Sequence, residues 1–124
     1  MYDKILVPLD GSALAEQVLP YVRPLAKALV ASIELLRTIP PVGLELAGPP
    51  PGPYPHRSGA NLQDQALDYL RSISGSLNDL GVSISYIVRQ GDPASWIIGE
   101  AEKEPGTLIA MSTHGRSGVA RWLL

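Results

Sequence analysis

The chain has 124 residues, of which 45% are hydrophobic and 18% are charged, and its formal net charge is −2. This length suits one domain over residues 1–124, and the charge offers no basic face of the kind that nucleic-acid-binding proteins carry. The absence of cysteine excludes disulfides, thiolate metal sites and cysteine nucleophiles within these residues. No apolar run reaches the ~20 residues that cross a bilayer, and the first residues do not have the pattern of a signal peptide. Composition therefore predicts a cytoplasmic protein that binds neither nucleic acid nor a membrane.

Residues 4–9 are apolar and rich in β-branched side chains, which predicts a first strand. Pro8 lies near the carboxyl end of this strand, where pairing should loosen because proline has no N–H to donate. The following Asp10-Gly11-Ser12 predicts a turn, with Ser12 as the N-cap of a helix. A second strand is predicted over residues 32–39.

The helix between these strands has apolar residues spaced by three and four, as expected when one face is buried. Pro20 and Pro24 lie inside it and predict a bend or an early loss of regular hydrogen bonding. The predicted inner face consists of Leu14, Val18, Tyr21, Val22, Leu25 and Leu29.

Residues 40–59 contain repeated proline and glycine and show neither helical nor strand periodicity. We expect a long, mobile loop here. A disordered insert is favoured over a functional loop beside a ligand, because polyproline composition needs no packed core.

The second half of the chain returns to regular periodicity. Residues 60–80 predict a helix that ends at Gly81, and residues 82–88 alternate as a strand at a sheet edge does. Asp92 and Pro93 predict the start of another helix, as N-cap and first-turn proline. The expected inner face of that helix is Ala94, Ile97, Ile98 and Ala101.

A fourth strand is predicted from Leu108, and it ends in the small polar loop of residues 112–118. Gly115 and Gly118 let another molecule approach the main chain closely, and exposed amides before a helix suit an anion such as phosphate. Residues 121–124 are expected to begin that helix.

Strands that alternate with helices predict an open parallel sheet with helices on both faces. If the first and fourth strands are neighbours, Asp10 and the loop of residues 112–118 face each other across one crevice. In such folds this crevice is the usual position of a nucleotide.

Four segments together resemble the universal stress protein family, whose members are small Rossmann-like domains. The matching segments are residues 5–12, 90–93, 109–118 and 121–124. The resemblance implies the sheet order 3-2-1-4, with the family's fifth strand missing from this chain. ATP-binding members carry Gly-x-x-Gly, nine residues, and then Gly with Ser or Thr. Ser112 stands at the first of these glycines and Gly115 at the second, and the sequence ends at Leu124, before the last pair.

The resemblance also implies ATP as the ligand, with or without Mg²⁺. Asp10 and the backbone near Pro8 would hold the nucleotide, and Thr38 would border the adenine. Ser112 and Gly115 would approach the ribose and the phosphates. Arg116 would bind a phosphate, or it would be a solvent-exposed charge at the start of a helix, and the two interpretations are equally favoured.

Two functions from different classes follow. The first is a stress-response regulatory protein that binds ATP, with hydrolysis slow or absent because the loop lacks the Gly-Lys-Ser/Thr end of a P-loop. The second is a nucleotide-free oligomerisation or interaction module, which the serine at position 112 and the missing last glycine favour. A homodimer is expected, although the fifth strand that pairs subunits in the family is absent. No catalytic residue and no protein metal site is predicted, and His114 is expected to bond to nearby backbone.

Overall fold

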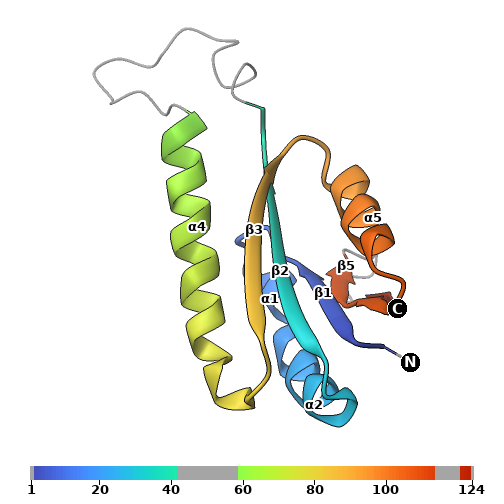
Figure 1. Cartoon of the computed structure of the whole chain (residues 1–124). Helices are drawn as coiled ribbons and strands as arrows, with labels where there is room; N and C mark the ends of the chain where they lie inside the picture. The colour runs from blue at the N-terminus through green and yellow to red at the C-terminus, as the bar shows by residue number, and fades with distance from the viewer. Residues whose placement is uncertain (1, 42–58, 114–120, 124) are drawn as a thin grey trace, which may run out of the picture.

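The computed structural model describes residues 2–41, 59–113 and 121–123. At its centre is a four-stranded parallel sheet in the order β3-β2-β1-β4 (Figure 1). The strands are β1 (Lys4–Pro8), β2 (Ser32–Ile39), β3 (Ile84–Gln90) and β4 (Thr107–Ile109). The predicted fold class and strand order are therefore confirmed, including the pairing of β1 with β4.

Helices cover both faces of this sheet. On one face lie α1 (Ala13–Glu16), α2 (Leu19–Leu29), α4 (Gly59–Ser76) and the short helix η1 (Asn78–Leu80). The other face is covered by α5 (Pro93–Lys103), which contacts β1, β2 and β4. Right-handed crossovers between parallel strands give this arrangement.

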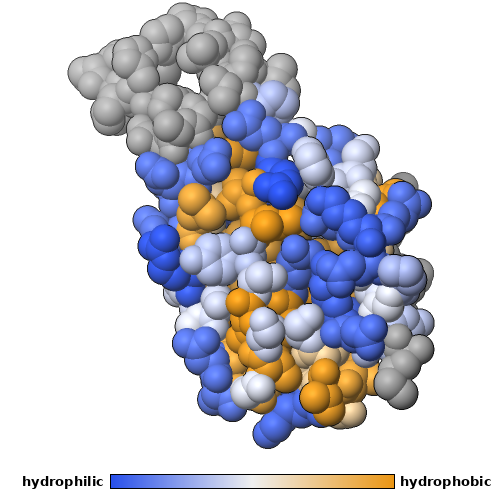
Figure 2. Space-filling view, in the orientation of Figure 1, coloured by the Kyte–Doolittle hydropathy of each residue, from blue (hydrophilic) through white to orange (hydrophobic). Residues whose placement is uncertain are grey.

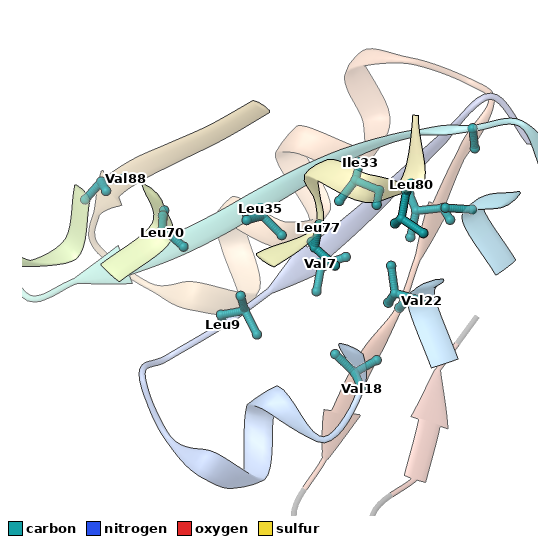
Figure 3. Close-up of a cluster of buried hydrophobic side chains, with 14 of the residues drawn as sticks. Val7, Leu9, Val18, Val22, Ile33, Leu35, Leu70, Leu77, Leu80 and Val88 are labelled. Carbon is teal, nitrogen blue, oxygen red and sulfur yellow. The ribbon is translucent and has the colours of Figure 1, made fainter. Parts of the chain in front are cut away.

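The main core lies between the sheet and the helices α2 and α4 (Figure 3). Because side chains alternate along a strand, Ile5 and Val7 of β1 and Leu35 of β2 face these helices. Leu6 and Leu36 face the opposite side, toward α5. β1 is buried on both faces and is apolar from Ile5 to Val7, whereas β2 also carries polar residues at partly buried positions.

The segment after β1 forms two helices; the break between them precedes Pro20, and Pro24 lies inside the continuous helix α2. Ser12 caps α1 by accepting a hydrogen bond from the Ala15 N–H at 3.1 Å, and α2 begins only at Leu19, with Pro20 in its first turn. Most of the predicted inner face is buried or half-buried, but Tyr21 is wrong, because its side chain is 60% exposed. The fully buried positions are Val18, Val22 and Ala26, spaced by four, and at 100° per residue Tyr21 falls outside the face that they form.

The middle of the chain agrees with the sequence. The predicted helix over residues 60–80 is α4 followed by η1, and Gly81 ends it with a left-handed φ of 73°. The predicted third strand is β3, at one edge of the sheet, with Ser83 and Ser85 exposed in alternation.

The predicted start of α5 is confirmed, because the Asp92 side chain accepts the Ser95 N–H at 3.0 Å. Half of its predicted inner face is wrong: Ala94 is exposed and Ile98 is 56% exposed. The side chain that α5 buries most is Glu100, at 3% exposure, which pairs with Lys103 at 2.6 Å. This ion pair allows a carboxylate to occupy a position that hydrophobicity alone assigns to an apolar residue.

The end of the chain differs from the prediction. β4 stops at Ile109, and Ala110 donates its N–H to the Leu6 carbonyl at 2.9 Å. A second strand, β5 (Met111–Thr113), then pairs antiparallel with β6 (Arg121–Leu123). Ser112 therefore lies within a strand, and the expected helix start at residues 121–124 is wrong for residues 121–123. The antiparallel pairing with β5 gives the backbone groups of residues 121–123 their partners.

Two expectations fall outside the described residues. The first is the long loop expected over residues 40–59, of which the structure describes only Pro40, Pro41 and Gly59. The second is the part of the small polar loop from His114 to Gly118, with the expected backbone bond of His114. Among the described residues, no helix is long and apolar enough to span a bilayer. Charged and polar side chains cover much of the surface, with apolar patches between them (Figure 2).

Candidate functional site

A hollow of about 180 Å³ opens at the carboxyl ends of the central strands. β1, β2 and β5 contribute its inner wall, and the first turns of α5 contribute the opposite wall. The volume is below the roughly 300–1,000 Å³ of typical small-molecule pockets, so it suits part of a ligand. The lining residues are Pro8, Leu9, Asp10, Ala15, Leu36, Thr38, Pro93, Ile97, Met111 and Ser112.

Four residues that the sequence singled out line this one hollow. Pro8 ends β1, Asp10 lies in the turn after it, Thr38 is the last residue but one of β2, and Ser112 belongs to β5. Parallel strands place their carboxyl ends along one edge of the sheet, which brings these distant positions together. The other two, Gly115 and Arg116, lie outside the described residues.

Asp10 provides the anionic group at the rim. Its Oδ1 accepts the Ser12 N–H at 2.8 Å, which closes the turn after β1. Partial burial raises the pKa of Asp10, but the hydrogen bonds from Ser12 and the positive charge of Arg37 outweigh it and hold this pKa below its ordinary value. The carboxylate is therefore ionised at neutral pH and can accept hydrogen bonds from a ligand hydroxyl.

Ser112 connects two elements at the edge of the hollow. Its hydroxyl donates to the Leu14 carbonyl at 2.6 Å, so the side chain ties β5 to α1. The hydroxyl proton is engaged within the protein, although the oxygen still has a lone pair that can accept a hydrogen bond.

The apolar part of the lining was not predicted from the sequence. Ile97 and Pro93 come from one face of α5, and Met111 lies immediately before Ser112. Leu36 completes this apolar surface, and its outward alternation on β2 was the feature that could have indicated it. The walls are therefore mostly apolar, with a few polar groups at the rim, as in many small-molecule sites.

The described residues hold no group of three or more histidine, aspartate or glutamate side chains that is placed to bind a metal ion. The predicted chemistry at the hollow is thus that of a carboxylate, hydroxyls and backbone groups beside an apolar surface.

Comparison with known proteins identifies relatives over the full length of the chain. The model of the universal stress protein family matches residues 1–124. Universal stress protein MJ0531 of Methanocaldococcus jannaschii is 32% identical over 127 residues, which cover 100% of this chain and 72% of that protein. Universal stress protein Sll1388 of Synechocystis is 27% identical over 99% of this chain and 86% of that protein.

Solved structures agree. The structure of MJ0577, also from Methanocaldococcus jannaschii, superposes with a TM-score of 0.73 at 27% identity, covering 96% of this chain and 80% of that one. A universal stress protein family member from Arabidopsis thaliana, solved with AMP bound, shares the fold at 14% identity with a TM-score of 0.59, over 94% of this chain and 80% of that one. The match over every residue of the sequence and the shared sheet order show that this chain belongs to the universal stress protein family.

Proposed function

We propose that this protein is a stress-response binding protein that takes up an adenine nucleotide, ATP, in the hollow, without efficient catalysis. The observation that carries the proposal is the convergence of Pro8, Asp10, Thr38 and Ser112 on one hollow. These residues come from separate parts of the chain, and the resemblance to the family independently implies a nucleotide at each of these positions.

The chemistry of the walls fits the base and the sugar. Leu36, Ile97 and Met111 offer an apolar surface on which an adenine ring can rest, with Thr38 at its border. The Asp10 carboxylate can accept a hydrogen bond from a ribose hydroxyl.

The phosphates would extend beyond this small hollow. Gly115 and Arg116 follow β5 in the sequence after one intervening residue, and they would supply an amide and a guanidinium to the phosphates. Mg²⁺, when bound, would be carried chiefly by the phosphate oxygens, since no metal-binding cluster occurs among the described residues. The Arabidopsis structure adds support, because a protein of the same fold holds AMP.

A titration with ATP tests this function. At a free concentration of 100 times its dissociation constant, a ligand that binds only the folded state adds about 2.7 kcal/mol to the free energy of unfolding. Thermal unfolding with ATP, with AMP and with GTP, each with and without Mg²⁺, should show the shift for the adenine nucleotides. Asp10→Ala should reduce it strongly, whereas Asp68→Ala, which removes an exposed carboxylate on α4, should leave it unchanged. The absence of any shift in the wild-type protein at millimolar ATP would refute the proposal.

One observation favours the second function, a nucleotide-free interaction module. Asp10 and Ser112 already have internal hydrogen-bond partners, in Ser12 and Leu14, so neither depends on a ligand for a partner. In that case ATP produces no shift in the unfolding temperature, and sedimentation velocity should show self-association.

We propose a homodimer in the cytoplasm under either function, and the exposed Ile98 of α5 offers apolar surface for it.

A further inference from the structure

Arg37 lies at the carboxyl end of β2, on the face of the sheet opposite the hollow. Its strand neighbours Leu36 and Thr38 line the hollow, so alternation places Arg37 on the side of α4. There its guanidinium carbon stands 5.0 Å from the centre of the Tyr69 ring. This distance is within the range of a cation–π contact, which holds the guanidinium plane in a defined place.

The Tyr69 ring is itself fixed by a second element. Its hydroxyl donates to Glu16 Oε2 at 2.6 Å, which links α4 to the end of α1. Burial, and then the hydrogen bond to Glu16, raise the pKa of Tyr69, so the phenol keeps its proton and remains a donor at any physiological pH. Arg37 therefore rests on a platform that is anchored to both α4 and α1.

The other side of the guanidinium lies directly against the turn that carries Asp10. A Cβ atom added at Gly11 would lie 2.5 Å from Arg37 Nη1 and 3.2 Å from its Cζ. Only glycine leaves room for so close an approach, and its φ of +88° also disfavours any other residue. The guanidinium thus packs on the backbone between Asp10 and Ser12.

An ordinary structural salt bridge does not account for this placement. Within residues 2–41, 59–113 and 121–123, no carboxylate lies within 4.0 Å of an Arg37 nitrogen as an ion pair. Its buried Nε also has no hydrogen-bond partner among them. Its charge acts instead on the nearby turn, where it helps to keep Asp10 ionised.

We propose that Arg37 is a positioning residue for Asp10: from behind the sheet, it holds the Asp10–Ser12 turn and its carboxylate in the orientation that the hollow presents to a ligand. The part of this proposal that concerns the ligand rests on the proposed function. The effect on the turn does not, because it is a property of the protein without nucleotide.

The first test therefore uses the protein without ligand. Arg37→Met keeps an unbranched side chain of similar length and removes the guanidinium, and Arg71→Met is the matched control, since Arg71 lies exposed on α4 and pairs with Asp68. In Arg37→Met, NMR titration of the Asp10 carboxyl carbon should show its pKa rising toward the ordinary value, and the Ser12 amide should exchange faster with solvent. Arg71→Met should change neither. Equal Asp10 titration and equal Ser12 exchange in the two variants would overturn the proposal.

The second test measures nucleotide affinity in the same variants. Arg37→Met should bind ATP about tenfold more weakly, which corresponds to about 1.4 kcal/mol, and Arg71→Met should bind as the wild type does. Arg37→Lys keeps the charge without the planar contacts and should fall between them; it also serves as the test protein if Arg37→Met does not fold. If wild-type protein fails to bind ATP, the proposed function fails, while the Asp10 titration still decides the role of Arg37. If Arg37→Met binds ATP as tightly as the wild type, the positioning role is refuted.

Discussion

Lys4 provides the sharpest test of the energetics of this fold. It begins β1, and its side chain is only 11% exposed. Its Nζ lies 2.9 Å from Glu34 Oε1, on a side chain that is 13% exposed, and 3.1 Å from Glu104 Oε1, on a side chain that is 61% exposed. One lysine thus holds a buried carboxylate and a solvated one at nearly equal distances.

Replacing Lys4 by methionine keeps the apolar stem and leaves Glu34 without its counter-charge. Removing one partner of a buried ion pair costs about 3–5 kcal/mol, and we expect about 3 kcal/mol here because some solvent still reaches both groups. For a chain of this length that loss lowers Tm by roughly 3–5 °C for each kcal/mol. Glu104→Gln should cost about 0–1 kcal/mol, as expected of an exposed partner.

The double variant Lys4→Met, Glu34→Leu isolates the origin of the loss. If the loss comes from the stranded carboxylate, removing that carboxylate restores stability to within about 1 kcal/mol of the wild type. Burial lowers the pKa of Lys4, but its bonds to Glu34 and Glu104 outweigh this and raise the pKa above 10.5. This contribution is therefore complete below pH 10.5 and is lost only as the pH rises through the higher value in the folded protein, so urea unfolding at pH 7 measures it in full.

Two results would refute this reasoning. The first is a loss below about 1 kcal/mol for Lys4→Met, which would mean that the pair behaves as a surface pair. The second is a double variant as unstable as the sum of the single variants, which would mean that packing, and not charge, controls this corner of the sheet.

The remaining predictions concern single positions and are checked by urea unfolding. Val30 ends α2 with a left-handed φ of 51° and is 82% exposed, so Val30→Gly should stabilise the fold by about 0.5–1 kcal/mol, and an unchanged midpoint would contradict this. Leu70 is fully buried in the core, so Leu70→Ala should cost about 2–5 kcal/mol, and a loss below 1 kcal/mol would show that the core there is loosely packed. Ser112→Ala removes the donor to the Leu14 carbonyl and should cost about 1 kcal/mol, whereas Ser112→Thr should cost less. The pKa of Asp10 is lowered from 3.8, so its stabilising effect is present above pH 3.8 and is lost as the pH falls through the folded-state value; the advantage of wild type over Asp10→Asn should therefore vanish in acid.

The parts of the fold that local chemistry determines could be predicted from the sequence. The caps at Ser12 and Asp92 and the stop at Gly81 depend on their own neighbours, and each has the predicted role. The β2 strand has the predicted limits, residues 32–39, and Pro40 follows directly after it.

The parts that depend on distant partners could not be predicted. The exposure of Tyr21 depends on which part of the apolar face of α2 the core covers, and the burial of Glu100 depends on its pairing with Lys103. No local pattern in the sequence indicates the antiparallel pairing of β5 with β6. At the site, topology alone brought Asp10, Thr38 and Ser112 together, whereas the contribution of Ile97 depends on how α5 packs.

The bond between Ser112 and Leu14 joins residues 98 positions apart. During synthesis on a ribosome, α1 emerges long before β5 exists, and β4, the neighbour of β1 that precedes β5, is also made late. The nascent chain can assemble α1, α2 and β2 early, but the rim of the hollow closes only after Ser112 has left the exit tunnel. A partly made chain that has not yet exposed β5 would therefore lack the bond that closes the rim of the hollow.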